Sequence, residues 1–294
     1  MDEVVGRVLQ DDENFRVELI DWQGSAAVKK SAKPTAPKTR ADRLKNDVLG
    51  MRFFTDLTKA YSLNLYVPRV YESQTDFYVR EYIAGEHFLS ETASSEEAKP
   101  KLDELARLLA KIDRLEPGEQ IGYIGSSNYR NLEQSIPRWA NENVSDKLIT
   151  DEEAEKIKRL SAGLGKYLKP RIAHGDVSTY KHSYLMPDGK IAFIDFENFT
   201  TGAARYFDVA WCYTRLWSFA VSTDIPRYFL SSFMSQAEKP GHQAEQMMAV
   251  LIQRTLGMQK DADVDLQSKD VDYRHRAKEL LGLVLQNRLE LLHD

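Results

Sequence analysis

The sequence predicts an α+β protein in which a small antiparallel β-sheet with one helix precedes a larger, mainly helical part. Up to about residue 84, short runs rich in β-branched and aromatic residues alternate with clusters of turn residues, a pattern typical of strands. After Gly85, apolar residues recur at spacings of three and four, which is typical of amphipathic helices. We therefore expect two domains, residues 1–84 and residues 85–294.

The composition is that of a globular chain, with 42% hydrophobic and 29% charged residues among 294. The formal net charge of −5 gives no reason to expect nucleic acid as the main partner. No apolar run approaches the roughly 18 residues of a membrane helix, and the N-terminus lacks the pattern of a signal peptide. Cys212 is the single cysteine, which excludes an intrachain disulfide. We expect a cytoplasmic protein without a membrane partner.

The first part is expected to hold five strands and one helix. Turn residues at positions 10–14 and 23–25 separate the first three strands. The helix is expected from about residue 39 to 57, where apolar residues recur at helical spacing. The expected strands cover residues 4–9, 15–22, 26–30, 68–72 and 77–83.

The second part is expected to be helical around one hairpin. Ser94 with Glu97, and Thr150 with Glu153, have the spacing of capping boxes that begin helices. The sequence Pro187-Asp188-Gly189 predicts the turn of a hairpin between residues 183 and 195. Further helices are expected at residues 100–115, 207–220, 242–256 and 271–292.

Two aspartates follow apolar segments in a way that points to chemistry. Asp176 ends the run Ile172-Ala173-His174-Gly175, and Asp195 begins Asp195-Phe196-Glu197 after Ile194. A carboxylate next to buried chain is costly unless it is paired, hydrogen-bonded or bound to a metal. A hairpin between the two would bring both to one edge. Such a pair suits phosphoryl transfer, in which one carboxylate accepts a proton from a hydroxyl and the other holds Mg²⁺ on a phosphate.

These motifs, followed by Asp208-Val209-Ala210, resemble the aminoglycoside phosphotransferase and choline kinase-like family. Ala27-Val28-Lys29, the segment 79–86 and the helical segment 105–112 also match the family in its own order, so that the resemblance extends from about residue 4 to 217. It implies a bilobal protein-kinase-like fold, with a small antiparallel β-sheet lobe carrying one helix and a larger mainly α-helical lobe.

The resemblance implies a nucleotide site between the lobes. Lys29 would bind the α- and β-phosphates of ATP because it directly follows Ala27-Val28. Lys30 is the rival, since neighbouring residues of a strand point to opposite faces. Asp47 is the best match for the acid that pairs with this lysine, although the family usually has Glu. Glu81 and Ile83 would contact adenine through their backbone groups.

The resemblance also implies roles in the second lobe. Asp176 would orient and deprotonate the acceptor hydroxyl, and Asp195 would bind Mg²⁺. His174 would brace the loop rather than perform chemistry. Asp208 would hold the backbone of the catalytic loop from the start of a buried helix.

The sequence departs from the family at the second metal ligand. The usual Asn is replaced by Lys181, and His182 follows it. We place His182 beside the metal, although imidazole is a softer ligand than Mg²⁺ prefers. Either residue could instead contact phosphate as a cation. The first hairpin also carries acids at residues 11–13 instead of the glycines that cover phosphates.

The function expected from the resemblance is transfer of the γ-phosphoryl group of ATP to a hydroxyl of a small molecule, with Mg²⁺. The two departures leave open a pseudokinase that serves as a binding module. Phosphorylation of a protein is a weaker alternative, because no Ala-Pro-Glu motif follows Asp195. The acceptor would be shaped by residues 118–150 and the C-terminal helices, where no motif identifies it. The oligomeric state is not predicted.

Overall fold

The computed structural model describes residues 6–116, 124–125, 132–167, 169–239, 241–264 and 271–286. Within these residues, the amino-terminal part forms a five-stranded antiparallel sheet in the order β1-β2-β3-β6-β5. Gln23 and Gly24, both with positive φ, form the tight turn between β2 and β3. The first strand begins later than expected, and residues 4 and 5 lie outside the described residues. The strands are β1 (Val8–Asp11), β2 (Phe15–Trp22), β3 (Ser25–Ala32), β5 (Val70–Ser73) and β6 (Phe77–Glu81).

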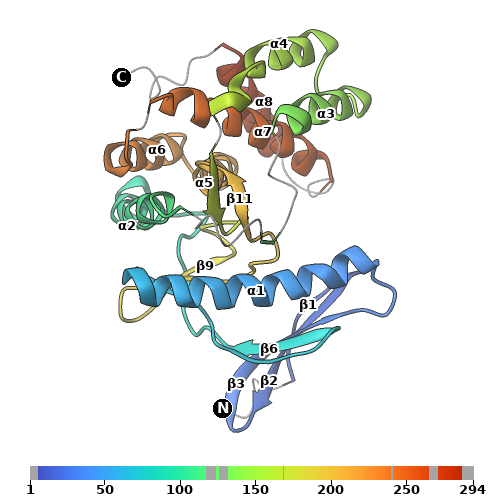
Figure 1. Ribbon diagram of the computed structural model, residues 1–294, viewed down its shortest axis with the longest axis vertical. Coiled ribbons are helices and arrows are strands. Elements are labelled where there is room, and N and C mark those ends of the chain that lie inside the picture. The colour runs from blue at the N-terminus through green and yellow to red at the C-terminus, as the bar shows by residue number, and fades with distance from the viewer. Residues whose placement is uncertain are drawn as a thin grey trace.

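Helix α1 (Lys38–Tyr61) packs against this sheet and lies between it and the helices of the second part in the view of Figure 1. Its buried apolar side chains are those of the predicted stripe, and they include Leu44, Met51 and Phe54. Gly50 lets the helix approach the following part of the chain closely, because a Cβ there would lie 2.5 Å from Cβ of Phe196. The helix is therefore packed on two sides.

A small sheet joins the two parts of the chain. Its order is β4-β10-β9-β7, with β4 (Leu65–Tyr66) parallel to β10 (Ile191–Phe193). The hairpin of β9 (Ser183–Leu185) and β10 is the one that the turn residues predicted, and β7 (Glu86–His87) pairs with β9. Since β4 lies before residue 84 and β10 well after it, the strand pairing crosses the expected boundary.

The remaining chain is mainly helical, as expected. Ser94 with Glu97 and Thr150 with Glu153 form complete capping boxes. A two-stranded pair of β8 (Pro170–Ala173) and β11 (Thr200–Ala204) was not anticipated. Residues 287–292 of the last expected helix lie outside the described residues. The helices are α2 (Ser95–Asp113), α3 (Leu132–Ser145), α4 (Asp151–Ser161), η1 (Leu164–Tyr167), α5 (Phe207–Phe219), α6 (Asp224–Gln236), α7 (Gln243–Val264) and α8 (Val271–Leu285).

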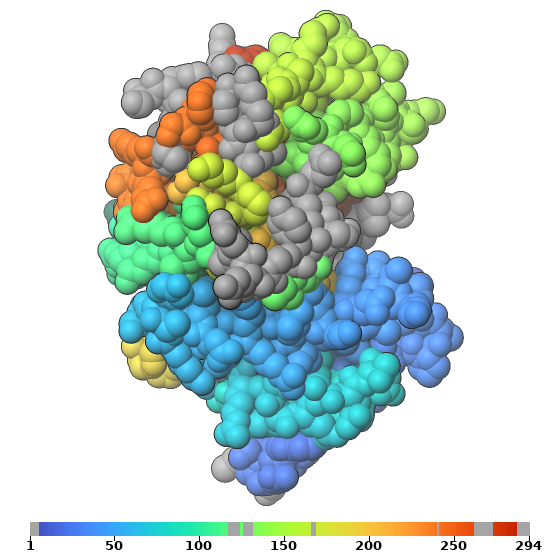
Figure 2. All heavy atoms as spheres, viewed as in Figure 1, coloured from blue at the N-terminus to red at the C-terminus, as the bar shows by residue number. Residues whose placement is uncertain are grey.

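The two parts occupy opposite ends of the molecule. In the space-filling view, the sheet and α1 (blue to cyan) form one end and the helices of the second part (green to red) form the other (Figure 2). The expected α+β architecture is confirmed. Of the helices that the described residues form, none has the length and apolar character needed to cross a membrane.

Candidate active site between the sheet and the helices

The loop that carries Asp176 is fixed by Asp208. Strand β8 ends at Ala173, and the chain then turns through Gly175, whose φ is 91°. A Cβ at Gly175 would lie 2.3 Å from the carbonyl oxygen of Asn198, so the turn requires glycine. From the first turn of α5, the carboxylate of Asp208 accepts hydrogen bonds from the backbone N–H groups of His174 (2.7 Å) and Gly175 (2.8 Å). This is the contact that the resemblance implied for Asp208.

His174 braces the segments that carry both aspartates. Its ring is buried, with Nε2 3.0 Å from the carbonyl oxygen of Ile194 and Nδ1 accepting the backbone N–H of Asp176 at 3.1 Å. The acceptor role of Nδ1 places the ring proton on Nε2, which then donates to Ile194. Burial lowers the pKa of His174 to about 4, so the ring is neutral at pH 7. Both nitrogens are occupied, which suits a positioning role.

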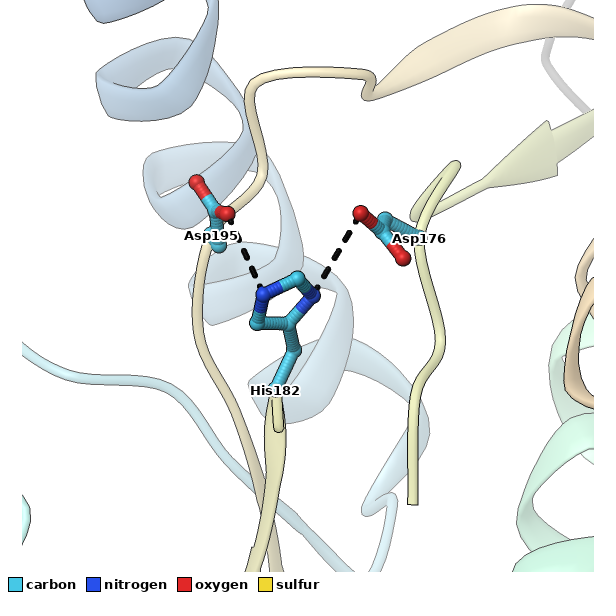
Figure 3. A group of neighbouring side chains, drawn as sticks. All are labelled: Asp176, His182 and Asp195. Carbon is cyan, nitrogen blue, oxygen red and sulfur yellow. Dashed lines mark ion pairs between the residues drawn. The ribbon is translucent and has the colours of Figure 1, made fainter. Parts of the chain in front are cut away.

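His182 lies between Asp176 and Asp195 (Figure 3). Its Nδ1 is 3.4 Å from Oδ2 of Asp176, and its Nε2 is 3.4 Å from Oδ2 of Asp195. One possible ligand atom from each residue lies within 4.8 Å of the others, a donor set that fits a divalent cation. Asp195 has a φ of 64°, a left-handed conformation that Asp tolerates better than most residues. The structure therefore brings together the three polar groups that the sequence singled out in this part.

The charges of this cluster are mutually stabilising. Burial alone would lower the pKa of His182, but Asp176 and Asp195 outweigh burial and raise the pKa to about 9. Burial would raise the pKa values of both aspartates, yet the cationic ring lowers that of Asp176, and Lys30 together with His182 lowers that of Asp195. Among the described residues, Oδ1 of Asp176 accepts no hydrogen bond. Because that oxygen is buried without a partner, a group that donates a hydrogen bond to it would offset the cost of its burial.

The lysine at this site is Lys30, and the preference for Lys29 is corrected. Nζ of Lys30 lies 2.7 Å from Oδ1 of Asp195 and 3.1 Å from Oδ2 of Asp47. Burial would lower the pKa of Lys30, but Asp195 and Asp47 raise it well above its ordinary value. Nζ of Lys29 lies instead 4.6 Å from the centre of the Phe77 ring. Because side chains alternate along β3, only one of the two lysines can face Asp195.

Asp47 connects the lysine to the loop after Asp195. Its side chain is buried and accepts hydrogen bonds from Lys30, from the Tyr78 hydroxyl (2.6 Å) and from the backbone N–H of Phe196 (2.8 Å). The shorter Asp side chain reaches these partners because α1 lies close to Phe196 at Gly50. Asp47 thus holds the position that the resemblance gave to the partner acid.

A cavity of about 400 Å³ opens between the sheet and the second part of the chain. Its volume lies in the range of small-molecule sites. Lys30, His182 and Asp195 form a charged end, which fits phosphates, and apolar side chains from both parts form walls that fit a flat base. The apolar lining includes Val17, Val28, Ile83 and Ile194.

Glu81 and Ile83, the two residues expected to contact adenine, have different environments. Ile83 lines the cavity, as expected of a residue next to the base. The carboxylate of Glu81 points away from the cavity and accepts hydrogen bonds from the Tyr66 hydroxyl (2.6 Å) and the backbone N–H of Arg69 (3.2 Å). The carbonyl oxygen of Glu81, expected to meet adenine, accepts a hydrogen bond from Nη1 of Arg80 at 2.9 Å. Sequence reasoning did not identify Arg80, because its position depends on the register of β6 against β3.

Solved structures share this architecture over nearly the whole chain. The ADP-bound aminoglycoside phosphotransferase APH(2'')-Ib superposes with a TM-score of 0.61 and 18% identity, over 97% of this chain and 93% of that chain. Choline kinase LicA from Streptococcus pneumoniae gives a TM-score of 0.56 and 14% identity, over 96% and 92% of the respective chains. Macrolide 2'-phosphotransferase MphH from Brachybacterium faecium gives 0.59 and 14%, over 94% and 91%. The fold is that of the protein-kinase-like phosphotransferases.

The chain belongs to the phosphotransferase enzyme family, which matches residues 6–236. This match confirms the resemblance drawn from the motifs. A search of curated protein sequences found no match.

Proposed function

We propose that this protein transfers the γ-phosphoryl group of a nucleoside triphosphate, with ATP as the donor expected from the sequence, to a hydroxyl group of a small molecule. The observation that carries the proposal is the convergence of Lys30, Asp195 and His182 at one end of the cavity, with the carboxylate of Asp176 beside His182. A cation, a carboxylate that can hold a metal and a carboxylate with an unpaired oxygen are the parts that positioning and charge stabilisation require in phosphoryl transfer.

Each residue has a defined part in this proposal. The hydroxyl oxygen of the acceptor forms a bond to the γ-phosphorus. The bond between that phosphorus and the oxygen that bridges the β- and γ-phosphates breaks, and this oxygen leaves with the nucleoside diphosphate. The hydroxyl proton passes to Oδ1 of Asp176. Lys30 would contact the α- and β-phosphates while Asp47 holds it in place. Asp195 and His182 would hold Mg²⁺, which offsets the charge of the phosphates when it is bound.

His182 has two alternative contacts. Its raised pKa, about 9, makes it an imidazolium in the nucleotide-free protein. An imidazolium has no free lone pair, so His182 must lose its proton to bind a metal. While protonated it would instead contact a phosphate as a cation. Both alternatives keep the residue at the phosphate end of the cavity.

Two substitutions test the proposal. Asp176→Asn should abolish turnover and leave nucleotide affinity unchanged, because the amide cannot accept the hydroxyl proton. Asp195→Asn should weaken binding of the Mg²⁺-nucleotide complex itself, measured by calorimetry with and without Mg²⁺. Asp188→Asn is the matched control, since that carboxylate is 53% exposed on the same hairpin. Full activity of Asp176→Asn on an identified acceptor would show that another group is the base.

A binding module without phosphotransfer is the second candidate, because Lys181 and His182 replace the usual ligand. Calorimetry separates the two: absence of Mg²⁺-dependent binding at millimolar nucleotide supports the binding module. A thermal-shift screen with Mg²⁺-nucleotide, followed by candidate acceptors added to it, is the direct route to the acceptor.

A further inference from the structure

Arg80 lies at the end of the cavity opposite the phosphate-binding groups. Strands β3 and β6 pair Lys30 with Tyr78 and Val28 with Arg80. Side chains two residues apart on a strand share a face, so Arg80 lies on the same face as Tyr78, one step further from the charged end. Arg80, like Val28 and Ile83, lines the cavity. If the triphosphate lies at Lys30, the base lies beside Arg80.

The guanidinium of Arg80 is buried without a carboxylate partner among the described residues. Arg80 is 9% exposed, and its hydrogen bond is to the carbonyl oxygen of Glu81. Arg205 and Arg171 are comparably buried, and each has a carboxylate partner, in Asp113 and Glu116 respectively. A buried cation that lacks such a partner is costly. A ligand with an acceptor atom at this place would reduce that cost.

The guanidinium of Arg80 can distinguish purines by the group at position 6. It has five N–H donors and no acceptor. The 6-amino group of adenine is also a donor, so it cannot accept from Arg80 and would have to share the Glu81 carbonyl oxygen with it. The 6-oxo group of guanine or hypoxanthine is an acceptor and can take an N–H from Arg80, as arginine does with guanine O6 in nucleic acids.

We propose that Arg80 makes the base end of this cavity selective for 6-oxopurine nucleotides over adenine nucleotides. The proposal rests on the proposed function, because it requires that the cavity hold a nucleotide, and it changes the expected donor from ATP to GTP or ITP. The alternative is that Arg80 moves aside when a nucleotide binds, which frees the Glu81 carbonyl for adenine.

Calorimetric titration of the wild-type protein with Mg²⁺ complexes of ATP, ITP and GTP tests this. ATP and ITP are a matched pair that differ at position 6 and in the proton on N1. We expect the Kd of ITP and of GTP to be at least about tenfold below that of ATP, the size of a good arginine–guanine contact. No acceptor and no turnover are needed for the measurement.

Variants test whether Arg80 causes the preference for ITP over ATP. Arg80→Met should remove the difference between ITP and ATP, mainly by weakening ITP, and Arg80→Lys should keep part of it because it retains a donor. Arg52→Met is the control, since it removes one positive charge from an exposed position on α1 outside the cavity. Thermal melting verifies that each variant is folded, and if Arg80→Met is not, the wild-type titrations and Arg80→Lys decide.

Each outcome is decisive. If the wild type binds ATP as tightly as ITP, the inference is overturned while the proposed function stands. If the preference for ITP persists in Arg80→Met, Arg80 does not determine it, and the inference is again overturned. If none of the three nucleotides binds, the inference and the proposed function fail together.

Discussion

The buried ring of His174 should contribute a loss of stability to the protein as the pH drops below 6.5. The pKa of the ring is about 4 in the folded protein, against an ordinary value of 6.5, because burial disfavours the charged form. Protonation of Nδ1 would also remove the acceptor for the backbone N–H of Asp176. A histidine with a depressed pKa contributes nothing pH-dependent well above 6.5, where the ring is neutral in both states. Below 6.5 the unfolded chain takes up the proton first and is favoured.

The magnitude follows from the two pKa values. At pH 5 the unfolded chain binds nearly one proton more than the folded chain at this site, and the unfolding free energy lost between pH 7 and pH 5 is about 2 kcal/mol. The loss continues to about pH 4 and reaches roughly 3 kcal/mol. For a domain of ordinary stability this is a large fraction of the total.

Equilibrium urea unfolding at pH 7 and pH 5 measures this loss in the wild type and in His174→Gln. The Gln side chain can donate and accept hydrogen bonds but does not titrate, so the variant should lose about 2 kcal/mol less than the wild type over this range. The comparison with the variant is needed because burial raises the pKa of Asp208 to about 7, so that protonation of Asp208 stabilises the folded protein as the pH falls. This gain is present in both proteins and cancels in the difference between them. His242→Gln is the control, since that side chain is 53% exposed. Equal losses in His174→Gln and the wild type would refute the reasoning.

Two further predictions concern the lysine and a buried ion pair. Lys30→Met should raise the Kd of the Mg²⁺-nucleotide about tenfold or more, and Lys29→Met should change it less than about twofold, measured by calorimetry; equal effects would contradict the assignment. Asp113→Ala should lower the unfolding free energy by about 3–5 kcal/mol, because it leaves the guanidinium of Arg205 buried without its bidentate partner. The matched control Asp146→Ala, at a site 51% exposed, should stay within about 0.5 kcal/mol in the same urea experiment.

The fold could be predicted where the signal is local. The apolar stripe of α1 and the two capping boxes depend on spacings of three and four residues, and the structure contains all of them. The β9–β10 hairpin follows from its turn residues. The pairing of β8 with β11 could not be predicted, because short buried strands carry no alternating pattern and their partner is set by the surrounding chain.

The site shows the same division between local and long-range information. Motif order was sufficient to select His182 and three aspartates. The structure places Asp47 and Asp195 beside Lys30, and Asp176 and Asp195 beside the ring of His182. The cavity and its volume depend on how the small sheet joins the two parts, which the order of motifs does not contain.

The choice between Lys29 and Lys30 shows why a strand can hide its orientation. An amphipathic strand reveals its inner face by alternation, but Ala27 and Val28 are 0% and 2% exposed although they lie on opposite faces of β3. The residues before the lysines therefore cannot tell which lysine faces inward. Lys30 pairs with Tyr78 on the neighbouring strand, and both side chains donate a hydrogen bond to Asp47. This pairing shows that Lys30 is the lysine that faces inward. The same register places Arg80 beside Val28, so one long-range fact determines both the residue at the phosphates and the residue at the base.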